Sequence, residues 1–223
     1  LGVADVDTRI RLARTYEDKG DPAGAETLYS AVLSEQPGAV MAAQGMERLF
    51  AASHDNEKAC AFWRELVRLY PEAFVPSFYL ASSLARSGAV AEAKSAFLKA
   101  LALDPTSPVA MYHAGILQIV TGDTDEGKEQ IRKALAIDPG LENAVTQKVN
   151  ETAARLLETN DPASAGALYE ATAALTPPDL WGKAAMGRIA EAKGDTAAAA
   201  VLYGEILKQD PSFPLTDNQK TVL

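Results

Sequence analysis

The chain has 223 residues, a formal net charge of −9 at pH 7 and an isoelectric point near 4.8. This acidic balance disfavours nucleic acid and anionic membrane surfaces as partners, because both are bound through an excess of lysine and arginine. No apolar run approaches the roughly 18 residues of a membrane-spanning helix, so we expect no membrane insertion by this segment. The single cysteine, Cys60, excludes an internal disulfide and a multi-cysteine zinc site.

A heptapeptide that occurs twice shows that the chain is repetitive. Residues 99 to 105 read KALALDP and residues 133 to 139 read KALAIDP, an offset of 34 residues. Successive copies of the closing proline are 34 residues apart, except across the fifth unit, where the spacing is 38. In chain order the prolines mark the ends of six units, near Pro37, Pro71, Pro105, Pro139, Pro177 and Pro211.

Each unit is expected to end in a helix with one buried face. A small residue stands twelve positions before each proline, and a bulky apolar residue stands eight positions before it. Residues four apart lie on the same face of a helix, so the small residue allows close approach beside a large side chain. The small residues are Ala25, Ala59, Ala93, Gly127, Ala165 and Ala199, and the bulky residues are Tyr29, Trp63, Phe97, Ile131, Tyr169 and Tyr203.

A tight turn is expected before each of these helices. Seventeen positions before each proline stands a residue type that readily adopts a left-handed backbone at a helix C-terminus. In chain order these residues are Gly20, His54, Gly88, Gly122, Asn160 and Gly194. Aspartate follows in five of the six units and can cap the next helix, whereas Ala89 takes that place in the third. The pattern therefore predicts that each unit is a helix, a turn and a second helix.

The fifth unit contains four more residues than the others. They fall within GLENAVTQKV at 140–149, and four residues are close to the 3.6 of one helical turn. We expect an added turn at the start of the first helix of this unit, because Leu141, Val145 and Val149 keep helical spacing. A longer connecting loop is the alternative.

The period, the paired small and bulky residues and the closing proline resemble the tetratricopeptide repeat. The resemblance covers about residues 6 to 211, although the leading tryptophan of the family is absent. It implies an all-α fold: a right-handed superhelical solenoid of antiparallel helix pairs, with residues 1–211 forming a single array. Residues 212–223 are expected to be a C-terminal tail or the start of a capping helix. The leucine position of the family's first helix holds Leu12, Met46, Leu80 and Met186.

The sequence contains no complete motif for nucleotide binding, metal binding or catalysis. GDTDEGKE at 122–129 has the glycine and lysine spacing of a phosphate-binding loop, but Glu129 stands where a hydroxyl should ligate magnesium and no strand precedes it. His54 is a turn residue, and His113 has no cysteine or histidine at ligand spacing. We therefore expect no catalytic residue, no metal site and no cofactor.

The resemblance implies that the first helices line a concave surface, and the repeat register selects the residues that face it. In the sixth unit the register selects Trp181 and Arg188. Aromatic and apolar residues in the middle of the array, with charged residues toward its ends, suit an extended peptide or an amphipathic helix. Alternatively, these side chains pack against neighbouring helices, or a terminal tail or a second copy of the chain covers them. The candidate partner-binding residues are Phe78, Tyr79, Tyr112, His113, Ile116, Ile119, Arg14, Arg48 and Arg86.

The expected function is that of a non-catalytic scaffold that binds a partner protein in this groove. The alternative is a regulatory or positioning domain of a larger enzyme or of a secretion or assembly component, and the start at Leu1 rather than Met fits an excised or processed chain. The alanine-rich composition suggests a bacterial protein. The segment is expected to be soluble, in the cytoplasm or the periplasm or as part of a longer anchored protein, so the compartment stays open, as does homo-oligomerisation.

Overall fold

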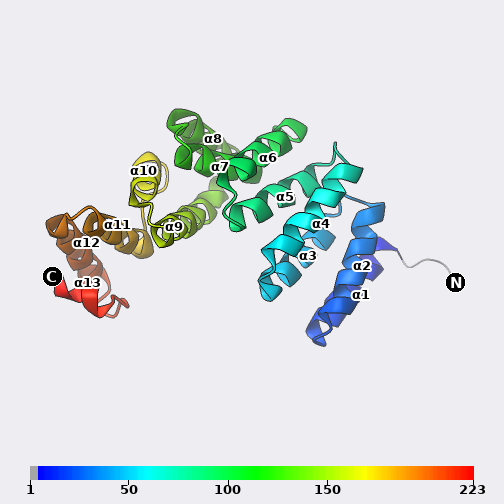
Figure 1. Cartoon of the computed structure of the whole chain (residues 1–223), viewed down its shortest axis with the longest axis horizontal. Helices are drawn as coiled ribbons and strands as arrows, with labels where there is room; N and C mark the ends of the chain where they lie inside the picture. Colours follow the sequence, from blue (N-terminus) through cyan, green and yellow to red (C-terminus); the bar gives the residue numbers. More distant parts are fainter. Residues whose placement is uncertain (1–4) are drawn as a thin grey trace. The chain divides into compact units, whose positions relative to one another are not determined.

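A computed structural model describes residues 5–223, and within that range it contains helices and turns but no β-strand (Figure 1). Six successive pairs of α-helices are followed by one short helix, which confirms the predicted all-α class and helix pairs. None of the described helices is long and apolar enough to cross a membrane. The elements are α1 (Val6–Asp18), α2 (Pro22–Glu35), α3 (Val40–Ser53), α4 (Asn56–Leu69), α5 (Phe74–Arg86), α6 (Val90–Leu103), α7 (Pro108–Val120), α8 (Thr124–Ile137), the 3-10 turn η1 (Pro139–Leu141), α9 (Glu142–Glu158), α10 (Pro162–Thr172), α11 (Leu180–Ala192), α12 (Thr196–Gln209) and α13 (Asp217–Thr221).

The bulky residues of the second helices form the core, as predicted. Tyr29, Trp63, Phe97, Ile131 and Tyr203 are 0% exposed and Tyr169 is 4% exposed. The six small residues that stand four positions before these bulky residues are buried as well. In the fourth repeat the two helix backbones approach very closely: a Cβ added at Gly115 of α7 would lie 2.6 Å from the carbonyl oxygen of Gly127 of α8. The repeated spacing therefore encodes the contact between the two helices of a pair.

The six predicted turn residues all adopt the left-handed backbone. Their φ values run from 54° at His54 and 59° at Asn160 to 97° at Gly122. Four of the following aspartates cap the next helix: the carboxylate of Asp55, for example, accepts the Lys58 amide at 2.8 Å. Asp123 stands at the same position of α8 without a capping bond from its side chain. The aspartates that cap are Asp21, Asp55, Asp161 and Asp195.

Replacing the exposed turn residue His54 by glycine should leave stability unchanged or raise the free energy of unfolding by up to about 1 kcal/mol. The left-handed backbone at His54 places strain on a residue with a Cβ, and glycine relieves it. Urea unfolding followed by circular dichroism measures the difference. Gly88→Ala is the matched control, because nothing lies within 4 Å of the added Cβ and only the φ of 84° resists it; it should lose about 1 kcal/mol. A clear loss of stability in His54→Gly would contradict this interpretation.

The four additional residues of the fifth repeat lengthen its first helix. α9 has 17 residues, whereas the other first helices have 13 or 14. α9 begins three residues after Pro139, as α3 begins three residues after Pro37. The added turn is therefore confirmed and the longer loop is excluded, because one helical turn preserves the buried face of Val145 and Val149.

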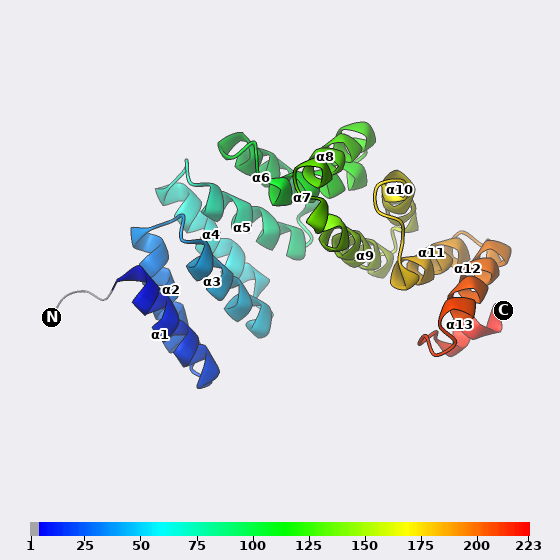
Figure 2. The same ribbon diagram turned by 180° about the vertical axis from the view of Figure 1, so that it is seen from behind.

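The chain divides into two compact units, one up to Ala110 and one from Met111, here called the N-terminal and C-terminal units. In the N-terminal unit, α1 to α5 share one hydrophobic core that includes Tyr29 and Trp63, and neighbouring pairs can be followed from behind in Figure 2. In the C-terminal unit, the segment after Pro211 folds back so that α13 lies beside α12 in both views (Figures 1 and 2). Phe213 and Leu215 are buried there.

Candidate functional site

A chain of polar contacts joins the first helices of the N-terminal unit. The Tyr29 hydroxyl donates a short hydrogen bond to Glu17, and Arg48 Nη2 donates to the same carboxylate at 2.9 Å. Burial alone would raise the pKa of Glu17, but the hydrogen bonds from Arg48 and Tyr29 lower it. Burial and the carboxylate raise the pKa of Tyr29 to about 12. The core tyrosine of one repeat is thus linked to an arginine of the next.

In the second repeat, the core tryptophan is linked in the same way, through a glutamate, to an arginine of the next repeat. Trp63 Nε1 donates to Glu47 at 2.5 Å, and Arg86 Nη1 of α5 lies 2.6 Å from the other oxygen of that carboxylate. Arg86 is held further by Ser83 at 3.2 Å and Asn56 at 3.4 Å. The guanidinium is therefore fixed in place across α3 and α5.

Between these contacts lies an open hollow of about 460 Å³. Tyr79 is stacked on the buried Trp63, with ring centroids 5.0 Å apart and an interplanar angle of 22°. Burial and the neighbouring Glu47 raise the pKa of Tyr79 to about 12, so its hydroxyl stays protonated and can donate a hydrogen bond. We call this hollow the α3–α5 groove; it is lined by Gln44, Glu47, Arg48, Ala51, Tyr79 and Arg86.

The structure brings together three of the residues selected from the repeat register. Arg48, Tyr79 and Arg86 all line the α3–α5 groove. Phe78 is half-buried beside it, with its ring edge-on to Phe97 at 5.6 Å. Arg14 is exposed on α1, three residues before Glu17. The groove is therefore bordered by charges and hydrogen-bonding groups, with Tyr79 as its aromatic residue.

The candidate residues of α7 are placed differently. Ile116 and Ile119 are 1% and 2% exposed, and Tyr112 is 7% exposed. His113 stacks on Tyr112 with ring centroids 4.5 Å apart; burial, together with Lys148, lowers its pKa to about 3, which keeps the imidazole neutral at pH 7. The α7 side chains Tyr112, Ile116 and Ile119 are therefore buried, whereas the open α3–α5 groove is lined mainly by polar residues.

Two further hollows lie in the C-terminal unit around Trp181, which is 60% exposed. The repeat register points to Trp181, but nothing in the sequence indicates that residues 213–219 form a wall of the hollow beside it. Phe213 packs against the indole with ring centroids 4.7 Å apart. Residues 213–219 line the hollow because this segment folds back beside α12. No position of the repeat predicts that return.

Comparisons with known proteins agree with the repeat architecture. Residues 48–108 and 80–142 match the family model described as tetratricopeptide repeat. Over 145 residues the chain is 30% identical to cellulose synthase operon protein C of Pseudomonas fluorescens (strain SBW25). This match covers 65% of the chain but 11% of that protein, so the chain spans about a tenth of the relative's length.

Two solved structures resemble this chain in fold over nearly its whole length. PilW, described as a widely conserved type IV pilus biogenesis factor, matches with a TM-score of 0.61 at 20% identity, over 98% of this chain and 99% of that one. The pilF protein of Pseudomonas aeruginosa matches with a TM-score of 0.55 at 18% identity, over 93% and 92% of the two chains. The family match shows that residues 48–142 are tetratricopeptide repeats, and the six helix pairs with their repeated packing residues continue the same architecture along the described chain.

Proposed function

We propose that the chain is a non-catalytic scaffold that binds an extended segment of a partner protein in the α3–α5 groove. The observation that supports this proposal most directly is the arrangement of Arg48, Tyr79 and Arg86 around one open hollow. The tetratricopeptide fold itself supports a role in protein interaction. The groove adds a specific surface on which that role can be tested.

The lining of the groove favours an extended peptide over the apolar face of an amphipathic helix. The amide of Gln44 and the partly exposed guanidinium of Arg48 offer hydrogen-bond donors, and Tyr79 offers one aromatic ring. An extended backbone presents unpaired carbonyl groups to such donors, whereas a helix has already satisfied its own. A bound helix would instead need a wider apolar surface, and Ile116 and Ile119 are too buried to supply it.

The sequence relative suggests a biological setting for this scaffold. Its name places it in a cellulose synthase operon, and it is bacterial. We propose by analogy that the present chain contributes to the assembly of a bacterial multi-protein system. The partner itself is to be found by experiment.

Site-specific photocrosslinking in the native host tests the proposed surface. A photoreactive amino acid at Gln44 or Ala51, both exposed in the groove, should capture a partner protein, and mass spectrometry should identify the joined segment. The matched control is the same amino acid at Lys99, which is exposed on the second helix α6. Capture mainly from Lys99 would place the working surface on the second helices and contradict the proposal.

The captured segment, prepared as a synthetic peptide, allows a quantitative test. Gln44→Ala should weaken its binding by roughly tenfold, because the amide lies in the groove and its removal disturbs no core packing. Lys99→Ala should leave the affinity unchanged. Equal affinities of the unchanged protein, Gln44→Ala and Lys99→Ala for the peptide would show that it does not use the α3–α5 groove.

A further inference from the structure

Trp181 stands between two adjoining hollows of about 480 and 610 Å³, both of which include Asn150. The first lies along the start of α9 and the residues that lead into α11. The second lies between α9, α11 and the returning segment that contains Phe213 and Gln219. Trp63, the other tryptophan of the chain, is fully buried at a core position of the repeat, whereas the Trp181 indole is 60% exposed at a position that the register directs to the expected concave surface.

Hydrogen bonds connect the start of α11, next to Trp181, to neighbouring helices. Asp179 caps α11 through the Gly182 amide at 2.7 Å and accepts a bond from Asn150 Nδ2 at 3.0 Å. Asn150 Oδ1 in turn accepts the Tyr169 hydroxyl at 2.9 Å. The start of α11, which carries Trp181, is therefore tied through Asp179 and Asn150 to α9 and α10.

The charge around the indole is negative. Among the described residues that line the first hollow, three are carboxylates, Glu142, Glu151 and Asp179, and none is lysine or arginine. Glu151 is paired with Lys148 at 2.8 Å, while Glu142 is exposed at the first turn of α9. The second hollow contains one arginine and one glutamate, Arg188 and Glu191, which balance each other. The field at Trp181 therefore attracts a cation.

We propose that the hollows around Trp181 bind an arginine-bearing extended segment of a partner protein, with the guanidinium on the indole face. Tryptophan is the side chain that attracts cations most strongly through its ring, and a planar guanidinium can stack on it while it bonds to a carboxylate. Glu142, Glu151 and Asp179 line the same hollow as Trp181 and can accept such a bond within it. This surface is separate from the α3–α5 groove, and the inference does not depend on that groove binding a partner.

The probe is a fluorescein-labelled glycine-serine peptide that carries several arginines, and fluorescence anisotropy measures its affinity. Trp181→Ala should weaken binding roughly tenfold, and Trp181→Phe should weaken it less because a ring is retained. A peptide with citrulline in place of arginine, which keeps the shape and removes the charge, should also bind roughly tenfold more weakly. Circular dichroism should show Trp181→Ala to be folded, because most of the indole is exposed.

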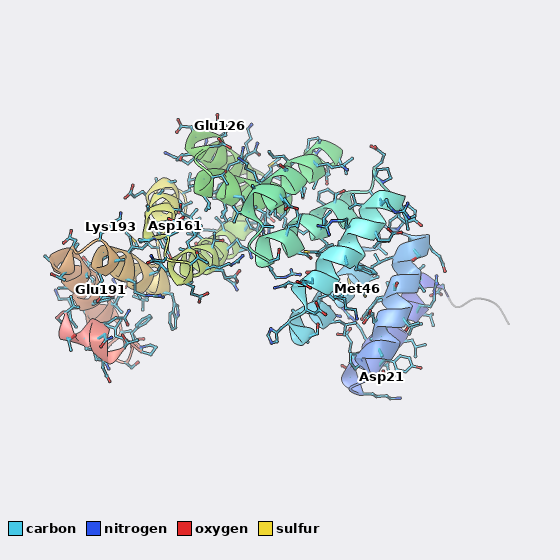
Figure 3. All side chains as sticks on the ribbon, viewed as in Figure 1. Asp21, Met46, Glu126, Asp161, Glu191 and Lys193 are labelled. Atoms are coloured by element: carbon cyan, nitrogen blue, oxygen red, sulfur yellow. The ribbon has the colours of Figure 1, made fainter. Side chains whose placement is uncertain are left out.

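Matched variants separate this site from general attraction to an acidic protein. Glu142→Gln and Glu126→Gln remove the same charge, but Glu126 lies on α8 and lines neither hollow (Figure 3). Glu142→Gln should weaken the arginine peptide several-fold, and Glu126→Gln and Gln44→Ala should not weaken it. Equal losses for the two glutamate variants, full binding to Trp181→Ala, or equal affinity for the citrulline peptide would each overturn the proposal.

Discussion

Phe97→Ala should lower the free energy of unfolding by about 3 to 5 kcal/mol, the range for truncating a buried aromatic side chain. The Phe97 ring in α6 is 0% exposed and packs edge to face against the Phe78 ring. Its removal takes away apolar contacts and leaves a cavity between α5 and α6. These two helices contact each other extensively, so they have little freedom to close over the gap.

The neighbouring Leu98 provides the control for this substitution. Leu98 lies on the same helix but is 40% exposed, so Leu98→Ala should cost less than about 1 kcal/mol. Urea unfolding at constant temperature, followed by circular dichroism, compares the two variants. If Phe97→Ala lost no more stability than Leu98→Ala, the bulky position of the repeat would not be a core position.

Gly115→Ala should cost roughly 3 kcal/mol, at the upper end of the range for overpacking a close contact. The added methyl group would meet the Gly127 carbonyl oxygen at 2.6 Å and the Ile131 side chain at 2.9 Å. The first of these atoms belongs to the backbone of α8 and cannot rotate away. The helices of the fourth repeat would have to separate, and the packing of Ile131 would loosen with them.

Gly204→Ala is the control, because Gly204 also lies inside a helix. The nearest atom to its added Cβ is a Leu223 methyl carbon at 3.7 Å, an ordinary contact. The substitution should therefore raise the free energy of unfolding by about 0.5 to 1 kcal/mol through the lower entropy of the unfolded chain. Thermal or urea unfolding of both variants gives the comparison, and a neutral Gly115→Ala would mean that α7 and α8 do not cross at these two glycines.

The sequence predicted the parts of the fold that depend on local chemistry. A left-handed turn favours glycine, asparagine or histidine, and a close helix contact needs a small residue, so the roles of Gly20, His54 and Gly127 could be inferred from residue type and spacing alone. The added turn of α9 was predictable for a similar reason, since an insertion of one turn keeps Val145 and Val149 on the buried face.

The proposed binding surface was less predictable, because the burial of a side chain depends on what covers each helix face. The repeat register placed Tyr79 and Ile116 on the same kind of face, yet Tyr79 borders an open groove and Ile116 is 1% exposed. The pairing of Arg86 with Glu47 joins residues 39 positions apart and follows no repeat spacing. Such contacts appear only when the helices are assembled.

The additional turn of α9 shows how a repeat protein can acquire a new surface. The turn adds about 6 Å of helix at one end of a single repeat and leaves the buried spacing of its neighbours intact. Glu142, Asn143 and Thr146, near its start, line the first of the hollows around Trp181. In evolutionary terms, the repeated units preserve the architecture, and a four-residue insertion gives one copy a surface that the other copies lack. Substitutions at the shared packing positions could also change one copy, but they would weaken the array.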